Sequence, residues 1–131
     1  PGSEYEPYDA RYSNAAGLAR AGVPVAIQSR DDENSRNLPF HAGFASAFGL
    51  PRTEAYRAVT LGAAEVLGLE AELGSLTPGK RADVIVTNGD LLDGTTAVEA
   101  IWIDGQDVDT GNRQTELYER YRERLHRVQA E

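Results

Sequence analysis

The chain has 131 residues, of which 40% are hydrophobic, and it carries a formal net charge of −8. This length and apolar content predict a globular domain or part of one, and the acidic balance argues against nucleic acid or an anionic membrane as a partner, since both favour a basic surface. The lack of cysteine excludes disulfides, thiolate metal sites and cysteine nucleophiles.

The N-terminal part predicts a helix followed by a short strand. Residues 1–12 show little periodicity, and we expect them to form an irregular loop. Ser13 or Asn14 can cap a helix that stops at Gly22. Val23–Gln28 then has the apolar character of a short buried strand. A helix, a glycine and a strand in this order are half of an α/β unit.

A highly polar run, Ser29–Asn37, follows this predicted strand directly. In parallel α/β folds, ligands and catalytic groups lie at the carboxyl ends of strands, so the run is a candidate site. The alternative is a solvated loop in which Asn37 caps the next helix and Pro39 lies in its first turn.

The next predicted helix, Leu38–Gly49, has a phenylalanine at every fourth position: Phe40, Phe44 and Phe48. We expect this stripe to lie in the core. His41 lies off the stripe, where a histidine is more often structural or exposed than a ligand. Two further helices are predicted at Arg52–Val59 and Leu61–Leu67, the second with Thr60 as its cap and Gly68 as its end.

The stretch from Leu73 to Asp90 predicts a turn and a strand. Thr77-Pro78-Gly79-Lys80 suits a type II turn, because proline presets φ at the second position and glycine accepts a positive φ at the third. Ala82–Thr87 contains a continuous apolar run, as expected of a strand that is covered on both faces. Asn88-Gly89 then turns the chain.

The C-terminal part predicts a hairpin and a helix. Val98–Ile103 alternates in polarity, Asp104-Gly105 is a hairpin turn into Gln106–Val108, and Trp102 is expected in the core. Thr110 or Asn112 can cap a final helix. Its glutamates and arginines, with pairs such as Glu116–Arg120, indicate a solvated face.

Four stretches, taken together, resemble the C-terminal end of a metal-dependent amidohydrolase of the imidazolonepropionase-like kind. They are AGVPVAIQS, NSRNLPFHAGFASAFGLP, EAYRAVTLGAAEVLGLEAELGSLTPGKRADVIVTNGDLLD and VEAIWIDGQDVD. The most specific part is the run from AVTLGAAEVLG to LGSLTPGKRADVIV. The order of the stretches also matches the family.

The resemblance implies an α/β fold in three parts. Residues 1–68 would be the C-terminal end of a (β/α)8 TIM barrel, with Val23–Gln28 as its eighth strand. Residues 69–109 would be part of a small composite β-sandwich. Residues 110–131 would be a C-terminal helix.

The family places an aspartate just past strand eight, where it binds a metal and accepts a proton from the attacking water. A carboxylate can do both. Anchoring on the Asn-x-Arg-Asn-Leu-Pro motif assigns this position to Asp31, and Asp32 is the second candidate. If Arg30 is the true equivalent, the site is inactive, because arginine can neither bind a cation nor act as a base. We expect Asn34, Arg36 and Asn37 to make loop and capping hydrogen bonds rather than substrate contacts.

The remaining metal ligands of the family, a His-x-His pair, a carboxylated lysine or glutamate and two further histidines, are missing. The chain holds only His41, His126 and one lysine, Lys80. Because a metal needs about three or four protein ligands, we expect a divalent metal, most simply zinc, in the complete enzyme and none on this chain alone.

The sequence therefore predicts a fragment of a metal-dependent hydrolase that acts on C–N bonds of a cyclic amide or amide, other than typical peptide bonds, and that is inactive in isolation. The lack of methionine and the start at Pro1-Gly2-Ser3 agree with a piece of a longer protein. Its expected partner is the missing N-terminal part of the barrel, or a second copy through unpaired strand edges. Two alternatives remain: a non-catalytic interaction module, and a calcium loop at Asp31-Asp32-Glu33.

Overall fold

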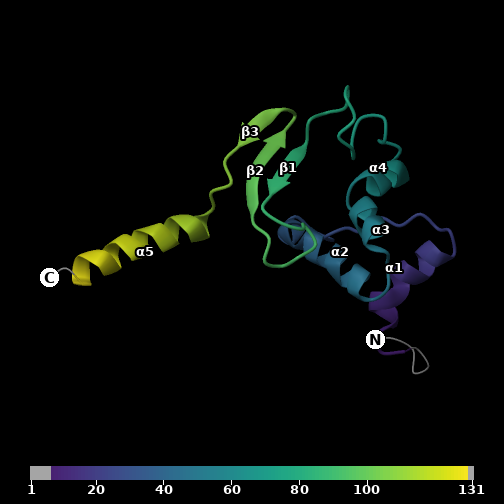
Figure 1. The fold of residues 1–131 in the computed structure, drawn as a ribbon, viewed down its shortest axis with the longest axis horizontal. Coiled ribbons are helices and arrows are strands. Elements are labelled where there is room, and N and C mark those ends of the chain that lie inside the picture. Colours follow the sequence, from purple (N-terminus) through teal and green to yellow (C-terminus); the bar gives the residue numbers. More distant parts are fainter. Residues whose placement is uncertain (1–6, 130–131) are drawn as a thin grey trace.

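A computed structural model describes residues 7–129 as a row of helices, a small sheet and a projecting C-terminal helix (Figure 1). The helical elements are α1 (Ala10–Arg20), the 3-10 turn η1 (Ser35–Asn37), α2 (Leu38–Ala47), α3 (Arg52–Ala58), α4 (Leu61–Leu67) and α5 (Arg113–Gln129). The strands β1 (Val84–Thr87), β2 (Val98–Ile103) and β3 (Gln106–Val108) form an antiparallel sheet in the order β1-β2-β3. Within the described part of the chain, no helix is long and apolar enough to cross a membrane.

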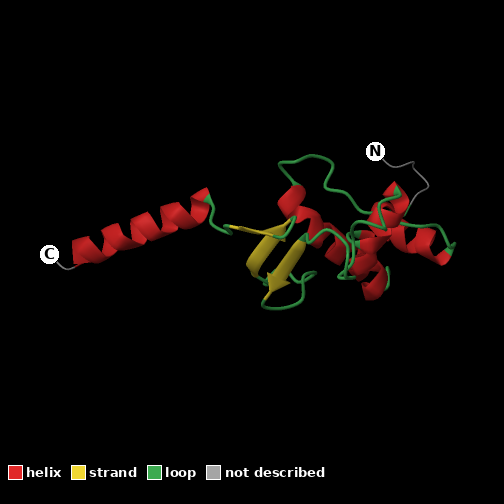
Figure 2. Cartoon of the chain, turned by 90° about the horizontal axis from the view of Figure 1, so that it is seen from above, coloured by secondary structure: helices red, strands yellow, loops and turns green. Residues whose placement is uncertain are grey.

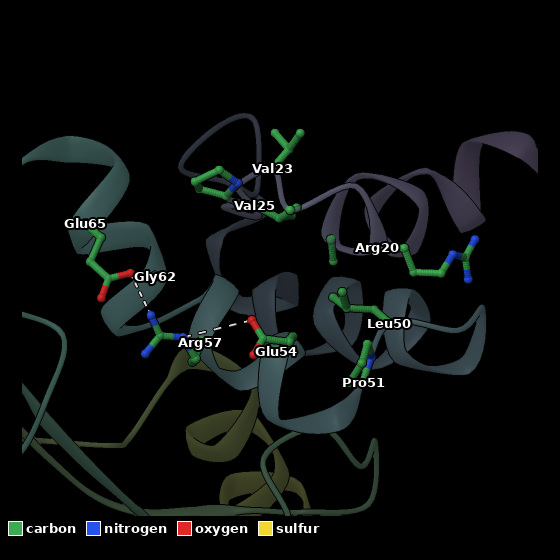
Figure 3. Close-up of a pocket in the computed structure, with 12 residues that line it drawn as sticks. Arg20, Val23, Val25, Leu50, Pro51, Glu54, Arg57, Gly62 and Glu65 are labelled. Atoms are coloured by element: carbon green, nitrogen blue, oxygen red, sulfur yellow. Dashed lines mark hydrogen bonds and ion pairs between the residues drawn. The ribbon is translucent and has the colours of Figure 1, made fainter.

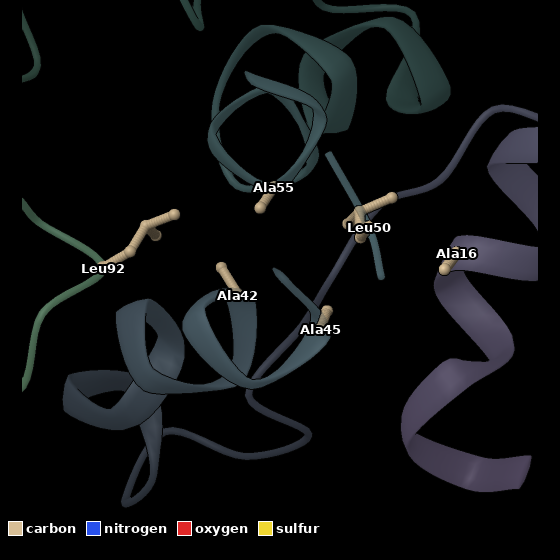
Figure 4. Packing of buried hydrophobic residues seen from close by; sticks show 6 residues of the cluster. All are labelled: Ala16, Ala42, Ala45, Leu50, Ala55 and Leu92. Atoms are coloured by element: carbon tan, nitrogen blue, oxygen red, sulfur yellow. The ribbon is translucent and has the colours of Figure 1, made fainter. Parts of the chain in front are cut away.

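The core is small and is built mainly from alanine. Helices α1 to α4 pack in chain order, each against the next. Four buried alanines from α1, α2 and α3 form one cluster with Leu50 from the α2–α3 connection and Leu92 from the β1–β2 loop. Figure 4 shows the six residues: Ala16, Ala42, Ala45, Leu50, Ala55 and Leu92. Gly43 permits this contact, because a Cβ there would lie 2.7 Å from the Leu92 carbonyl oxygen. Close packing of small side chains therefore joins α2 to the loop that follows β1.

The phenylalanine stripe of α2 does not lie in the core, which corrects the sequence prediction. Phe40 and Phe44 remain 43% and 59% exposed, while the alanines on the other side of the helix are buried. Phe44 and Phe48 instead contact Tyr12 of α1, with ring centroids 6.1 and 5.0 Å apart. The periodicity identified the helix correctly but assigned the wrong face to the interior.

The predicted strand Val23–Gln28 is extended chain without strand pairing, so that prediction is wrong for this chain. Its contact with the helices includes a backbone hydrogen bond of 2.9 Å from Ile27 N to Ala58 O. A strand needs a neighbouring backbone to pair with, and no described strand lies beside this segment. The expected loop at residues 1–12 is also partly wrong, since α1 begins at Ala10; residues 1–6 lie outside the described residues.

The ends of α4 follow the prediction, although one of its cap contacts does not. Gly68 has a left-handed φ of 70° and ends the helix, as glycine does at this position. The Thr60 hydroxyl donates to the Tyr56 carbonyl oxygen at 2.7 Å and makes no capping bond to α4.

The turn before β1 forms as predicted, but the strand is shorter and more exposed than expected. Lys80 N donates to Thr77 O at 3.2 Å and Gly79 has a φ of 96°, which is the type II arrangement. β1 begins at Val84 rather than Ala82. Ile85 is 46% exposed, so the strand is not covered on both faces. Among the described strands, β1 has a partner on one edge only (Figure 2).

The β2–β3 hairpin agrees with the prediction. Ile103 pairs with Gln106 across Asp104-Gly105, whose φ angles of 51° and 74° are those of a type I′ turn. Trp102, expected in the core, is only partly buried. The described residues thus confirm a mixed α/β chain with five α-helices and one three-stranded sheet, while a closed barrel is not formed within them.

Helix α5 is capped by Asn112, one of the two predicted caps. Its Oδ1 accepts hydrogen bonds from Gln114 N and Thr115 N at 2.9 and 3.1 Å. The ion pair on α5 joins Glu119 to Arg122 rather than the predicted Glu116 to Arg120. None of the described residues of α5 is buried, and the helix makes no extensive contact with another described element.

Candidate functional site

The polar loop of residues 29–37 folds back on itself. Arg30 has a φ of 78°, a left-handed conformation that is uncommon outside glycine. The chain therefore turns sharply before Asp31. Asp31 Oδ1 accepts hydrogen bonds from Asn34 N at 2.9 Å and from Asn34 Nδ2 at 2.7 Å. The carboxylate thus closes the short loop that leads into η1.

Asp31 remains exposed to solvent despite these bonds, and the described residues include no ion pair between it and Arg30. Both hydrogen bonds to its carboxylate come from a single residue three positions along the chain. A carboxylate in this setting keeps acceptor capacity for a cation or a proton. The assignment of a catalytic role to Asp31 stays a prediction.

The other polar residues of the loop also bond locally. Asp32 Oδ1 accepts from Glu33 N at 3.2 Å, and its carbonyl oxygen accepts from the Ser35 hydroxyl at 2.8 Å. Asn37 Nδ2 donates to Asn34 Oδ1 at 3.3 Å. The expected loop hydrogen bonds are therefore confirmed for Asn34 and Asn37.

These residues do not make a metal centre. Within residues 7–129, no group of three or more histidine, cysteine, aspartate or glutamate side chains converges on a point. His41 is exposed on α2, as expected of a histidine off the apolar face. Stable binding of zinc or calcium needs several convergent ligands. The ligand set of residues 7–129 therefore does not fit the metal that the resemblance implies, and within these residues the calcium-loop alternative has no structural support.

A second polar cluster, which sequence reasoning missed, joins α3 to the β1–β2 loop. Asp90 Oδ2 accepts from Arg52 Nε at 2.8 Å, and Arg52 Nη2 contacts the same oxygen. Asp90 Oδ1 accepts from the Tyr56 hydroxyl at 2.5 Å and from Leu92 N at 2.9 Å. The sequence predicts only a turn at Asp90, because nothing in the local sequence pairs it with residues 34 and 38 positions away.

The electrostatics of this cluster follow from its hydrogen bonds. The bond from Arg52, then the bond from Tyr56, lower the pKa of Asp90 to about 2. The same contacts raise the pKa of Arg52 and that of Tyr56. No helix makes more than marginal contact with a strand among the described elements. This cluster therefore links α3 to the β1–β2 loop, beside the packing of Leu92 on the helices. Its role is structural.

One cavity, of about 530 Å³, lies between the end of α1, the segment after it and α3–α4. Figure 3 shows Arg57 between two glutamates there: its Nη2 lies 2.6 Å from Glu65 Oε2 and its Nε lies 4.0 Å from Glu54 Oε2. The arginine and its neighbours compensate one another. Arg57 is therefore already paired within this cavity.

A larger groove, of about 860 Å³, separates α3 and α4 from β1. Its walls are mainly apolar, and its floor includes the turn before β1. Lys80 Nζ donates to the carbonyl oxygens of Glu70 and Leu73, the latter at 3.2 Å. Arg81 pairs with Asp83, and this pair lowers the pKa of Asp83. The cations of the groove are thus already engaged.

Parts of this chain are similar to proteins of known family. A family model described as "Amidohydrolase family" matches residues 47–109, a range that contains the Asp90 cluster but not Asp31. An imidazolonepropionase from Rhizorhabdus wittichii is 36% identical over 91 residues, which are 66% of this chain and 23% of that protein.

Two crystal structures are also similar. An amidohydrolase from Thermotoga maritima superimposes with a TM-score of 0.71 at 30% identity, over 75% of this chain and 26% of that one. A prolidase complexed with N-methylphosphonate-L-proline superimposes with a TM-score of 0.59 at 26% identity, over the same two shares. The chain thus spans about a quarter of the length of these relatives. The similarity to the amidohydrolase family model is confined to residues 47–109.

Proposed function

We propose that this chain is the C-terminal part of a metal-dependent hydrolase that acts on a C–N bond of a cyclic amide or amide, other than a typical peptide bond. The observation that carries the proposal is the 36% identity to an imidazolonepropionase over 91 residues. The fold agrees, since a solved amidohydrolase superimposes on three quarters of the chain.

In this proposal Asp31 is the functional carboxylate of the chain. It is exposed, its hydrogen bonds come from its own loop, and no ion pair among the described residues neutralises it. Its free lone pairs can hold a cation or take up a proton. Asp32 is the second candidate because it lies in the same exposed loop.

The isolated chain is inactive in this proposal, because its described residues bring no three metal-binding side chains together. The remaining ligands, and a bound zinc ion, belong to the complete protein. The partner that supplies them is the N-terminal part of the barrel, which also provides the pocket for a small-molecule substrate. Equilibrium dialysis of the chain with zinc should show no stoichiometric binding.

A chimera tests the assignment directly. The segment of the Rhizorhabdus wittichii imidazolonepropionase that aligns with this chain is replaced by the chain itself, and hydrolysis of the imidazolone substrate is measured with zinc present. We expect activity, and we expect Asp31→Ala to reduce kcat by at least about 10²-fold, as for other acid–base groups. A proline dipeptide, assayed in parallel, separates this activity from that of a prolidase.

Asp32→Ala is the matched control, because it removes a carboxylate from the same loop and should leave kcat within about threefold of the parent chimera. An active Asp31→Ala chimera would refute the assignment of Asp31. Loss of activity only in Asp32→Ala would move the role to that residue. Circular dichroism of each variant separates loss of chemistry from loss of folding.

A non-catalytic interaction module is the second candidate function, and the absence of a metal-ligand cluster among residues 7–129 favours it. In that case the chimera folds, binds zinc through the remaining ligands and stays inactive with every substrate. The two candidates thus differ in an outcome that the same experiment measures.

A further inference from the structure

Helix α5 is unpartnered and lies beyond the amidohydrolase-family match, which ends at residue 109. Figures 1 and 2 both show it projecting from the sheet, on the side away from α1–α4. Several large side chains along it are more than half exposed: Tyr118, Tyr121, Leu125 and Val128. A helix of this length gains most of its stability from packing an apolar face, so this helix requires a partner surface.

The residues of α5 separate into three stripes at the helical repeat of 100° per residue. One stripe is apolar: Leu117, Tyr118, Tyr121, Leu125 and Val128. The adjoining stripe is basic: Arg113, Arg120, Arg124 and Arg127. The acidic residues lie on the side away from the apolar stripe: Glu116, Glu119 and Glu123. The docking face of the helix is therefore apolar along its centre and positive along one edge.

The formal charge of α5 is opposite in sign to that of the preceding part of the chain. Residues 113–129 contain five basic and three acidic side chains, whereas residues 1–112 contain eight basic and 17 acidic ones. The helix thus carries a formal charge of +2 and residues 1–112 carry −9. Attraction between them favours docking of α5 on the rest of this protein, while the same −9 opposes binding to an anionic membrane.

Two α5 helices paired with each other would lack this complementarity of charge. In a symmetric antiparallel pair, like edges face one another, so the arginine stripes would meet. In a parallel pair the arginine stripe would face the opposite edge, which carries Arg122 and His126 and no carboxylate. Neither arrangement places a carboxylate against the arginines.

The groove that separates α3 and α4 from β1 matches the docking face of α5, because its walls are mainly apolar and carboxylates lie along its border. Leu67, Leu76 and Ile85 in its walls are 71%, 84% and 46% exposed. Glu70 and Glu72 lie in the loop that borders it, and neither carboxylate forms an ion pair among the described residues. We propose that α5 of one copy docks in this groove of a second copy, with its arginine stripe toward the bordering carboxylates.

A second copy is favoured over the same chain by topology. α5 leaves from β3, at the edge of the sheet farthest from β1, and residues 109–112 are its only connection. Four extended residues reach about 14 Å, and crossing the three strands already takes about 10 Å. The helix would then still have to reverse its direction around the sheet. Exchange between two copies removes this constraint and closes a two-fold dimer.

The size of the contact suits a weak but specific dimer. A 17-residue helix is about 25 Å long and about 10 Å wide, so one footprint covers about 250 Å². Reciprocal docking, counted on both partners, buries about 1,000 Å², which is close to the lower limit for a specific interface. We therefore expect dimerisation that depends on protein concentration and weakens as salt screens the arginines.

Cysteine cross-linking tests the contact, since the chain has no cysteine of its own. A chain with Leu76→Cys is mixed with a size-tagged chain carrying Leu125→Cys, under mild oxidation. We expect disulfide-linked heterodimers. The matched control replaces Leu125→Cys by Glu123→Cys, on the opposite face of α5, and should give at least about tenfold less product. Equal yields, or no cross-link in either mixture, would overturn the proposal.

Sedimentation of the unmodified chain gives the second readout. Leu125→Asp and Leu76→Asp should each shift the dimer to monomer, whereas Glu123→Gln should not; these side chains are exposed, so the variants keep the fold. A monomer at all concentrations would overturn the proposal. A disulfide within one chain that carries both cysteines would also overturn it, because it indicates docking within the same chain. Binding of the monomer to phosphatidylserine vesicles would overturn it as well. None of these results depends on hydrolase activity.

Discussion

Asp90 and Asp31 are two loop carboxylates with opposite surroundings, the first partly buried and the second exposed. Asp90 accepts hydrogen bonds from Arg52 and Tyr56, which belong to α3, and its pKa is lowered to about 2. Among the described residues, the Asp31 carboxylate accepts hydrogen bonds only from Asn34, three residues away. The carboxylate of Asp90 is fully engaged in hydrogen bonds that join α3 to the β1–β2 loop. The second closes its own loop and keeps capacity for chemistry.

The contrast shows that a perturbed carboxylate is not by itself a catalytic one. Strong perturbation often marks functional sites, but structural ion pairs produce it as well. In this chain the perturbed group, Asp90, lies inside the range that the family model matches, residues 47–109, and links α3 to the β1–β2 loop within it. The proposed functional group, Asp31, lies outside that range. Four variants separate the two roles, beginning with the largest expected effect.

Gly43→Val should be the most destabilising change. The added Cβ would lie 2.7 Å from the Leu92 carbonyl oxygen, so α2 and the loop that carries Asp90 would be forced apart. We expect a loss of about 1–3 kcal/mol, the usual cost of overpacking. Chemical denaturation measures it. Gly17→Ala is the control: it meets nothing within 4 Å in α1 and should stabilise by about 0.5–1 kcal/mol. Equal behaviour of the two variants would show that Leu92 does not hold the loop on α2.

Asp90→Ala should lower the melting temperature clearly, because Arg52 and Tyr56 lose their shared acceptor and the sheet loses a tie to the helices. Its effect should be smaller than that of Gly43→Val, since the cluster is exposed to solvent and screened. Amide hydrogen exchange should show faster exchange at β1 and at the β1–β2 loop. Unchanged exchange there would refute the structural role of the cluster.

The pH dependence of stability should separate Asp90 from the rest of the chain. Its pKa falls from 3.8 to about 2 on folding, so the folded state favours the ionised form. The stabilisation is therefore complete above about pH 4 and is lost as the pH falls through 2. Asp83 and Asp93 have lowered pKa values as well and act in the same direction. Asp90→Asn should thus flatten, but not abolish, the acid limb of a plot of melting temperature against pH.

Asp31→Ala should have the smallest effect on stability. It removes hydrogen bonds that lie within one exposed loop, and surface changes of this kind are usually within about 0.5 kcal/mol. Thermal melting of the chain should therefore be almost unchanged, while the chimera loses activity. A large drop in melting temperature would mean that Asp31 is a structural cap, and the catalytic assignment would lose its main support.

Most local features of the fold could be predicted from the sequence. The turn at Thr77–Lys80, the hairpin at Asp104-Gly105, the end of α4 at Gly68 and the cap at Asn112 all form as expected. Each depends on the conformational preference of one residue, or on a hydrogen bond across a few positions. Such signals act over the same short range that a sequence pattern reports.

The tertiary structure alone decided which surfaces are buried and which carboxylate is paired. The phenylalanines of α2 remain exposed because alanine and glycine allow a closer approach on the other face. Val23–Gln28 stays unpaired because no described strand lies beside it. Asp90 meets Arg52 across 38 positions. Pairing and burial depend on which segments meet in space, and no local pattern records that.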